Sequence, residues 1–294
     1  MGTRHARPER GLITRPSVSE VLEYRRYVDD AMNHLIDHNC HPSLVGQLTR
    51  LGVQHEQQHQ ELMLMDILNL FSRNPTFPSY EAKAEKIFTI GNSVPAWRGF
   101  EGGLYDIGHN GAGFAFDNES PLHRVFLEPF ELSDRLVTNE EWLEFISEGG
   151  YERPEFWLSD GIEAARSGFW KAPLYWRGDS DVGWHQMTLY GMQPIDPKVP
   201  VSHVSFFEAD AFARWSGARL PTESEWEVAA FGKPVTGNTL GNGYLRPLPF
   251  RDGMGDQMFG DLWEWTASPY VGYPGFTPSA GPTSEYNGKF MCNQ

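Results

Sequence analysis

The stretch SLVGQLTRLGVQHEQQHQELMLMDILNLF, residues 43–71, is the longest helical pattern in this chain, and Asn74-Pro75 follows it as a stop signal. On a wheel of about 100° per residue, one face carries a leucine stripe that His55 and His59 interrupt near its middle. The other members of this stripe are Leu44, Leu48, Leu51, Leu62 and Asp66. We therefore expect the stripe to face the core of a helical bundle and to place two imidazoles within it.

These two histidines are candidate metal ligands. Imidazoles one helical turn apart can bind a single metal ion from one face, and Gln58 lies beside them. The alternative is a pair of core histidines satisfied by hydrogen bonds alone. A catalytic metal needs at least three protein ligands, and the residues do not identify the third. His34, His38 and His41 could donate, but surface or capping roles suit them as well.

The residues before this helix contain a second helical pattern and a basic segment. Ser17 and Ser19 are N-cap candidates for a helix over Val18–His38. The preceding segment, MGTRHARPERGLITRP, is dense in arginine. These arginines are Arg4, Arg7, Arg10 and Arg15. They form either a solvated basic arm or a site for carboxylates, which arginine binds bidentately.

Composition narrows the class of protein. The chain has 294 residues, with 24 Lys and Arg against 39 Asp and Glu, and a net charge of −15 that argues against a nucleic-acid partner. No apolar run approaches the roughly 18 residues of a membrane span. Cys40 and Cys292 are too far apart in sequence for a CxxC motif and indicate no disulfide framework, which suits the cytoplasm. The length predicts about two domains.

The second predicted domain is loop-rich. After a connector over residues 77–100, glycine, proline and aromatic residues become frequent, and we see no internal repeat. Short helices are expected at Asn139–Glu148 and at Glu208–Ser216, the latter continued by Glu223–Phe231. This pattern predicts an α+β domain rather than alternating βαβ units. We expect three tryptophans in its core: Trp226, Trp263 and Trp265.

Several motifs together resemble the ergothioneine-biosynthesis sulfoxide synthases. The first half contributes GTRHARPERGLITRPS and HEQQHQELMLMDIL. The second half contributes, in order, ESPLHRV at 119–125, LVTNEEW at 136–142, PVSHVSF at 200–206, ARLPTESEWE at 218–227 and GDLWEWT at 260–266. The resemblance covers essentially the whole chain.

The resemblance implies two domains and a metal. Residues 1–90 would be the C-terminal part of a DinB-like helical bundle, and residues 91–294 a formylglycine-generating-enzyme-like domain related to C-type lectins. Three histidines of the family hold Fe(2+), of which His55 and His59 would be two. The third belongs to an earlier helix that this chain does not contain, and the family's Arg-Gly-Gly-Ser segment is absent after Gln294. We therefore expect a fragment.

The resemblance also implies an O2-dependent reaction that joins a thiol, γ-glutamylcysteine or cysteine, to the imidazole of trimethylhistidine as a sulfoxide. Gln58 would bind the histidine-derived substrate, and Arg4 and Arg7 the carboxylates of the thiol. A tyrosine would donate a proton. Tyr270, Tyr273 and Tyr286 all lie in the region that the resemblance indicates, and we take Tyr270 and Tyr286 as the candidates. The expected partners are these small molecules, without nucleic acid or membrane, and the expected state is a cytoplasmic monomer.

Other functions remain open at this stage. One alternative is an ovothiol-type or selenosugar-using relative with other substrates. Another is a zinc-dependent DinB-type thiol transferase, which shares the bundle and a three-histidine metal site. A non-catalytic binding module would use the second domain to present loops to a ligand. We reject formylglycine formation, because it needs a pair of late cysteines and only Cys292 is present.

Overall fold

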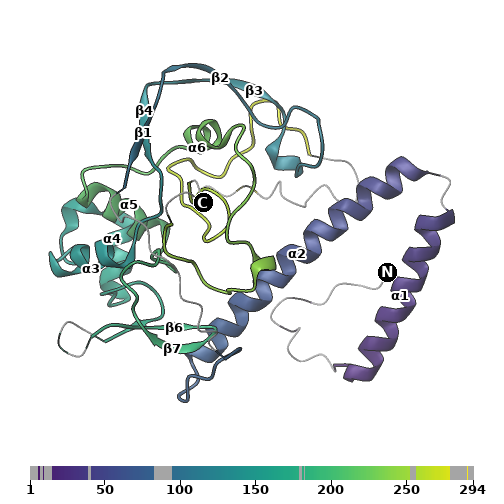
Figure 1. The fold of residues 1–294 in the computed structure, drawn as a ribbon, viewed down its shortest axis with the longest axis horizontal. Helices are drawn as coiled ribbons and strands as arrows, with labels where there is room; N and C mark the ends of the chain where they lie inside the picture. Colours follow the sequence, from purple (N-terminus) through teal and green to yellow (C-terminus); the bar gives the residue numbers. More distant parts are fainter. Residues whose placement is uncertain are drawn as a thin grey trace. The chain divides into compact units, whose positions relative to one another are not determined.

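The computed structural model describes residues 6, 9, 15–38, 41–82, 95–178, 181, 183–251, 256–278 and 290. The chain separates into two compact units, Met1–Gln60 and Glu61–Gln294. This contact-based division lies inside a helix, whereas the predicted domain boundary lies near residue 90. Figure 1 shows the elements of both units.

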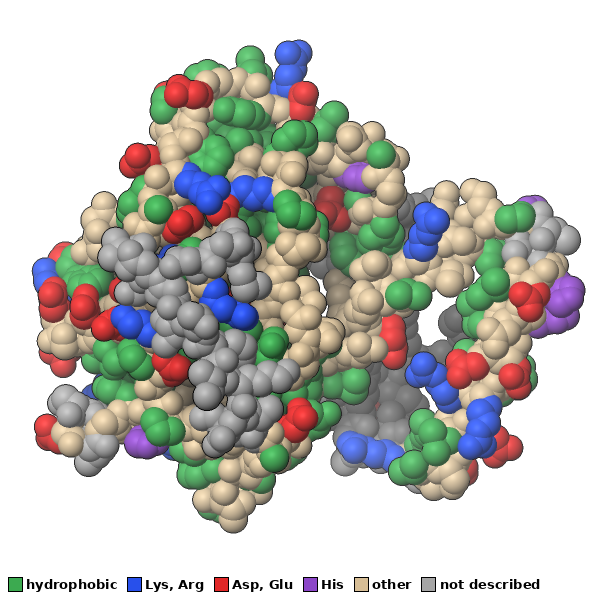
Figure 2. All heavy atoms as spheres, viewed as in Figure 1, with side chains coloured by type: hydrophobic (Ala, Val, Ile, Leu, Met, Phe, Trp, Pro, Cys, Tyr) green, Lys and Arg blue, Asp and Glu red, His purple; other side chains and the backbone are tan. Residues whose placement is uncertain are grey.

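Two helices precede the α+β part of the chain. Helix α1 spans Val18–His38 and α2 spans Pro42–Ser72, as the periodicity predicted to within a residue. Ser17 begins α1, where its backbone N–H and its hydroxyl each donate to Glu20 at 2.7 Å. No residue of α1 is buried, and Figure 2 shows hydrophobic and charged side chains intermixed on it.

The predicted bundle core is not present among the described residues. Leu44, Leu48 and Leu62 of α2 are all about half exposed, at 54%, 51% and 49%. The expectation that this stripe is buried was therefore wrong for the part of the chain that the structure describes. A helix supplies only one side of a core, and burial requires further elements to cover it.

The second unit is a mixture of short helices and small antiparallel sheets. Strand β1 (Trp97–Phe100) pairs with β4 (Phe130–Ser133), and β2 (Gly103–Ile107) pairs with β3 (His123–Leu127). A three-stranded sheet has the order β5 (Trp176–Arg177), β6 (His185–Thr188) and β7 (Gly191–Pro194). The α+β class of this region is thus confirmed.

The predicted helices of this unit are present, with one addition. They are α3 (Asn139–Ser147), α5 (Phe206–Trp215) and α6 (Glu223–Ala230), whereas α4 (Ser159–Ser167) was not predicted. Single-turn 3₁₀ helices lie at η2 (Asp117–Glu119), η3 (Pro154–Phe156) and η4 (Leu240–Asn242). Helix α6 does not continue α5, because Ser216 to Thr222 turn the chain between them.

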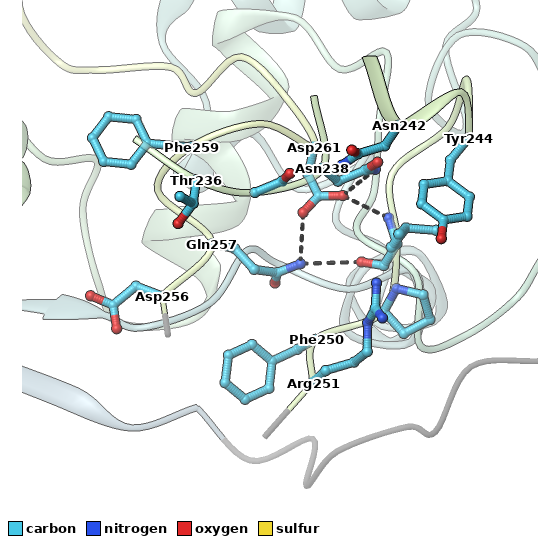
Figure 3. Close-up of a pocket in the computed structure, with 13 residues that line it drawn as sticks. Thr236, Asn238, Asn242, Tyr244, Phe250, Arg251, Asp256, Gln257, Phe259 and Asp261 are labelled. Atoms are coloured by element: carbon cyan, nitrogen blue, oxygen red, sulfur yellow. Dashed lines mark hydrogen bonds between the residues drawn. The ribbon is translucent and has the colours of Figure 1, made fainter. Parts of the chain in front are cut away.

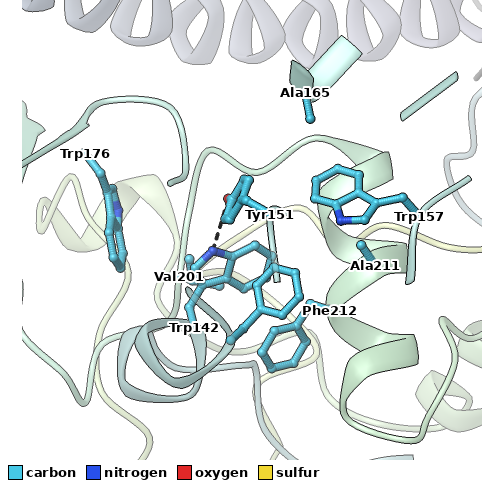
Figure 4. Close-up of a cluster of buried hydrophobic side chains, with 9 residues drawn as sticks. Trp142, Tyr151, Trp157, Ala165, Trp176, Val201, Ala211 and Phe212 are labelled. Carbon is cyan, nitrogen blue, oxygen red and sulfur yellow. Dashed lines mark hydrogen bonds between the residues drawn. The ribbon is translucent and has the colours of Figure 1, made fainter. Parts of the chain in front are cut away.

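An aromatic cluster forms the main core of this unit (Figure 4). Trp142 of α3 is 1% exposed and stacks on Phe212 of α5, with ring centroids 4.9 Å apart. The Tyr151 hydroxyl accepts from the Trp142 indole at 3.3 Å and donates to Glu208 at 2.7 Å. Aromatic stacking and a satisfied buried polar chain therefore join α3 to α5.

A smaller apolar cluster anchors the end of α2 in the second unit. Leu68, which is 6% exposed, packs with Met187 and Leu189 at the β6–β7 hairpin. Leu64 and Phe71 lie in the same cluster, so one face of the last two turns of α2 contributes to it. These contacts make the last turns of α2 part of the unit Glu61–Gln294.

The prediction of no internal repeat was wrong at the scale of eight residues. Residues 135–142 read RLVTNEEW and residues 219–226 read RLPTESEW, and both begin a helix in the same way. In each copy the arginine pairs bidentately with the glutamate six residues later. These bonds are 2.9 and 2.9 Å for Arg135–Glu141, and 2.7 and 2.6 Å for Arg219–Glu225. The two glutamates also complete capping boxes on Thr138 and Thr222.

A polar network holds the loop that precedes residues 263–273 (Figure 3). Asp261, at a positive φ of 46°, accepts from Asn238 and from the backbone of Leu248, both at 2.8 Å. Gln257 also donates to it at 3.3 Å. The Asp261 carboxylate thus connects Asn238, Leu248 and Gln257. This network lies directly before the segment that carries Tyr270 and Tyr273.

Candidate functional site

His55 and His59 bring two ring nitrogens together on α2. Their Nε2 atoms are 3.2 Å apart, and the rings meet edge-on with centroids at 4.5 Å and an interplanar angle of 85°. Metal–nitrogen bonds of about 2.1 Å would separate two such ligands by roughly 3.0–3.4 Å at angles of 90–109°. This separation fits a shared metal ion, and it fits equally a hydrogen bond in which one Nε2–H donates to the other Nε2.

A second histidine pair one turn apart has a different geometry. His34 and His38 of α1 stack face to face, with centroids at 4.5 Å and an interplanar angle of 21°. The Nδ1 atom of His38 lies 3.1 Å from the carbonyl oxygen of His34. Parallel stacking and a backbone contact account for this pair without a metal.

The structure describes only some of the other predicted site residues. Gln58 lies on α2, half-buried, immediately before His59. No group of three or more His, Cys, Asp or Glu suited to a metal occurs among the described residues. Arg4, Arg7 and Tyr286 lie outside the described part of the chain, so their predicted roles stay predictions.

The second unit contains a tyrosine–glutamate cluster, formed by Tyr270, Tyr273, Glu223, Glu227 and His123. Glu223 and Glu227 lie one turn apart on α6. The Tyr273 hydroxyl lies 3.0 Å from Glu223 and 3.5 Å from Glu227, within donating distance of both. The His123 ring, at the start of β3, packs on the Tyr273 ring at 4.5 Å. One phenol thereby bridges two like charges that would repel on an isolated helix.

A glycine completes this arrangement. The Gly108 N–H donates to Glu227 at 2.6 Å. Gly108 has a φ of +97°, and a Cβ there would lie 3.0 Å from the carbonyl oxygen of Pro121. Only glycine adopts this positive φ without strain and has no Cβ to clash with Pro121. The backbone N–H of Gly108 can therefore approach the Glu227 carboxylate.

The cluster shifts the proton affinities of its members. Burial raises the pKa of Tyr273 well above its usual range, and the charges of Glu223 and Glu227 add to this effect. Glu223 keeps exposed surface as a residue, yet desolvation raises the pKa of its carboxyl, partly offset by the hydrogen bond from Tyr273. Both groups thus hold protons more tightly than they would in water.

Tyr270 has a different environment. Its hydroxyl accepts from the Asn118 side chain at 3.2 Å. Burial raises the pKa of Tyr270, as do the charges of Asp117 and Glu223, whereas the Asn118 hydrogen bond lowers it. The net effect is a raised pKa, so Tyr270 holds its proton more tightly than a phenol in water, and the Asn118 hydrogen bond only partly offsets this.

The tryptophans of the GDLWEWT segment are not in the core. Trp263 is 85% exposed and Trp265 is 45% exposed, so their predicted core placement was wrong, and Trp226 is only partly buried. The indole N–H groups of Trp263 and Trp265 donate to Glu61 and to the Val204 carbonyl. These polar partners lie near the surface and hold the rings there.

The sequence did not single out Glu223 and Glu227 as a pair that acts on a tyrosine. Their contacts with Tyr273 span 50 and 46 residues, and that of Glu227 with Gly108 spans 119. The signal that could have found them is their position in two motifs. His123 lies in ESPLHRV, and both glutamates lie in ARLPTESEWE.

Comparison with known proteins identifies the class. The family model of the sulfatase-modifying factor enzyme 1-like domain matches residues 89–245. The chain belongs to this family. It is also 36% identical over 255 residues to hercynine oxygenase of Mycolicibacterium smegmatis, covering 78% of this chain and 57% of that protein.

Two further relatives agree. Hercynine oxygenase of Mycolicibacterium thermoresistibile is 38% identical over 260 residues, which is 77% of this chain and 54% of that protein. Ergothioneine biosynthesis protein 1 of Schizosaccharomyces pombe is 29% identical over 178 residues, covering 56% and 20%. These matches confirm the resemblance to the ergothioneine sulfoxide synthases. The chain spans about half the length of the first two relatives.

None of the helices in the described part of the chain combines the length and apolarity that a membrane-spanning segment needs.

Proposed function

We propose that this chain is part of a non-haem iron sulfoxide synthase of ergothioneine biosynthesis. In the proposed reaction one thiol, one imidazole and one O2 give one sulfoxide and one water. The carbon–sulfur bond forms at the imidazole of trimethylhistidine, and the thiol is γ-glutamylcysteine or cysteine. The enzyme would be a cytoplasmic monomer, and its partners would be these small molecules.

The observation that carries this proposal is the convergence of the two Nε2 atoms at 3.2 Å on α2. The similarity to two hercynine oxygenases supports it, since both relatives cover about three quarters of the chain. Fe(2+) bound by His55, His59 and a further histidine would supply O2 activation and open coordination positions. Residues 1–90 would then belong to a DinB-like bundle.

The chain's own residues would orient the substrates and move a proton. Gln58, next to His59, would hydrogen bond the histidine-derived substrate, and Arg4 and Arg7 would pair with carboxylates of the thiol. Tyr270 would donate the proton, because Asn118 favours loss of its proton while neighbouring charge keeps it protonated at rest.

Metal analysis tests the proposal. The protein at its full native length, purified without O2, should hold about one iron per chain and consume O2 only with both organic substrates present. His55→Ala and His59→Ala should each remove the iron and the activity. The double variant His34→Ala, His38→Ala is the matched control, since it removes another i,i+4 pair from a helix.

Iron retained in the His55 and His59 variants, or lost equally in the control, would show that the metal assignment is wrong. Zinc instead of iron would favour a thiol transferase. Iron without substrate-dependent O2 uptake would leave the site correct and the proposed reaction wrong.

A further inference from the structure

A cavity lies in the unit Glu61–Gln294, and its lining residues are far in sequence from the tyrosine–glutamate cluster. It has a volume of about 520 Å³, between the C-terminal end of α2 and the segment 174–177 that enters β5. Figure 1 shows this end of α2 beside β6 and β7. Small-molecule sites in proteins have volumes of roughly 300–1,000 Å³, so the size suits an organic ligand.

The charge of the lining is opposite to that of the chain. Arg73 and Arg177 line the cavity, and none of the lining residues is acidic, although the chain has 39 Asp and Glu against 24 Lys and Arg. Within the described ranges neither arginine lies within ion-pair distance of a carboxylate. Arg135 and Arg219, by contrast, each have a bidentate partner. The cavity is therefore a local positive site in an acidic protein.

Arg177 makes one hydrogen bond and one ring contact within the described part of the chain. Its Nη2 donates to the Ser72 carbonyl at 3.1 Å, and its guanidinium lies 5.0 Å from the centre of the Phe77 ring. The carbonyl contact satisfies one acceptor at the end of α2, which is a structural role. A guanidinium has five N–H donors, so this role leaves donors for an anion.

The other walls supply further donors and apolar surface. Asn74 accepts through Oδ1 from the backbone and the hydroxyl of Thr76, at 3.0 and 2.8 Å, which turns its amide NH2 to other partners. Tyr175 contributes a hydroxyl, and the charge of Arg73 lowers the pKa of this phenol against a larger rise from burial. Phe77 and Leu174 add apolar surface.

The backbone at this cavity is strained on both walls. Phe77 has a φ of +44° and Tyr175 a φ of +74°, in a region that residues with side chains rarely occupy. Tyr175 also packs edge-on against His203, another residue with positive φ, at 4.9 Å. Three of the six non-glycine residues with positive φ in the described chain thus lie at or against one cavity. Such strain is concentrated at ligand sites.

We propose that this cavity binds a small organic dicarboxylate, with one carboxylate at Arg73 and the other at Arg177. Two guanidinium groups on separate chain segments match two separated anionic groups. The apolar walls match the aliphatic carbons between them. An inorganic phosphate would engage one cluster of charge and leave most of the volume unfilled.

Calorimetric titration of the full chain with glutarate tests this site. Valerate, the monocarboxylate of the same length, and inorganic phosphate are the comparison probes. Glutarate should bind one per chain. Arg73→Gln and Arg177→Lys should each weaken it at least about tenfold, because a bidentate charged contact is lost. Arg166→Gln, which removes an exposed arginine of α4, should leave the affinity unchanged.

Arg73 is exposed, so its replacement should leave folding intact, and a thermal melt by circular dichroism verifies this. The proposal is wrong if glutarate gives no saturable heat up to about 10 mM. It is also wrong if valerate or phosphate binds as tightly as glutarate, or if Arg166→Gln weakens binding as much as Arg73→Gln. This readout needs neither iron nor O2, so it is independent of the proposed function.

Discussion

Tyr270 and Tyr273 lie three residues apart, yet their hydroxyls have different partners. The Tyr273 phenol lies within donating distance of two glutamates of α6, whereas the Tyr270 phenol accepts from Asn118. Tyr273 therefore bridges Glu223 and Glu227, and for this reason we propose Tyr270 rather than Tyr273 as the proton donor. The sequence offered both without distinguishing them, because the difference depends on residues more than 45 positions away.

At this scale we predict the effect of removing each hydroxyl. Tyr270→Phe should lower kcat for sulfoxide formation by about 10²–10⁴-fold, the usual size of a general-acid contribution, with a smaller change in KM. Product formation is measured by mass spectrometry alongside O2 uptake.

Tyr273→Phe is the matched control, since it deletes the same atom three residues away. It should act mainly on stability, because two neighbouring carboxylates lose their shared donor. A larger loss of kcat in Tyr273→Phe than in Tyr270→Phe would reverse the assignment.

The RLxTxxEW motif occurs twice, in two environments that differ in the burial of its arginine. Both copies use the same cap and the same arginine–glutamate pair. The Arg135 side chain is 4% exposed, however, while that of Arg219 is 61% exposed. The first copy is built into the aromatic core through Trp142, and the second contains Glu223 of the tyrosine–glutamate cluster, with Glu227 directly after it.

This contrast predicts unequal costs for one substitution made in the two copies. Glu141→Gln leaves the Arg135 charge buried without a counter-ion, which should cost about 3–5 kcal/mol of unfolding free energy. Glu225→Gln leaves Arg219 exposed to water, so no charge is stranded in the interior, and the cost should be smaller than for Glu141→Gln even though the Glu225 side chain is 7% exposed. Glutamine can still complete the capping box in both variants. Any difference between them therefore does not come from the helix caps. Equal losses in urea denaturation would contradict the role assigned to burial.

At the scale of the whole molecule, helix α2 is shared between two compact units. Its last turns pack on the β6–β7 hairpin, and its earlier residues belong to the unit Met1–Gln60. All ten tryptophans lie between residues 97 and 265, so tryptophan fluorescence reports on the second unit alone.

Leu68→Ala should therefore destabilise the second unit by about 2–5 kcal/mol, as core leucine truncations do. Leu44→Ala, at a leucine that is 54% exposed on the same helix, should change the same transition by less than about 0.5 kcal/mol. Urea unfolding followed by tryptophan fluorescence measures both. No loss for Leu68→Ala would mean that the end of α2 is not part of this unit.

Local signals in the sequence determined much of the secondary structure. Periodicity located α1 and α2, and helical patterning located α3 and α6 to within about one residue. The spacing of His55 and His59 was sufficient to predict that their rings meet, because positions i and i+4 share a helix face. These features depend on neighbours within about one turn, where covalent geometry sets the distances.

Tertiary structure alone decided what is buried and which distant groups meet. It exposed Trp263, buried Arg135 but not Arg219, and brought Gly108 to Glu227 across 119 residues. It also set two arginines on one cavity that the sequence did not connect. The physical reason is that desolvation and packing depend on which other parts of the chain pack over a residue. A motif with the same sequence in two places does not determine which parts those are.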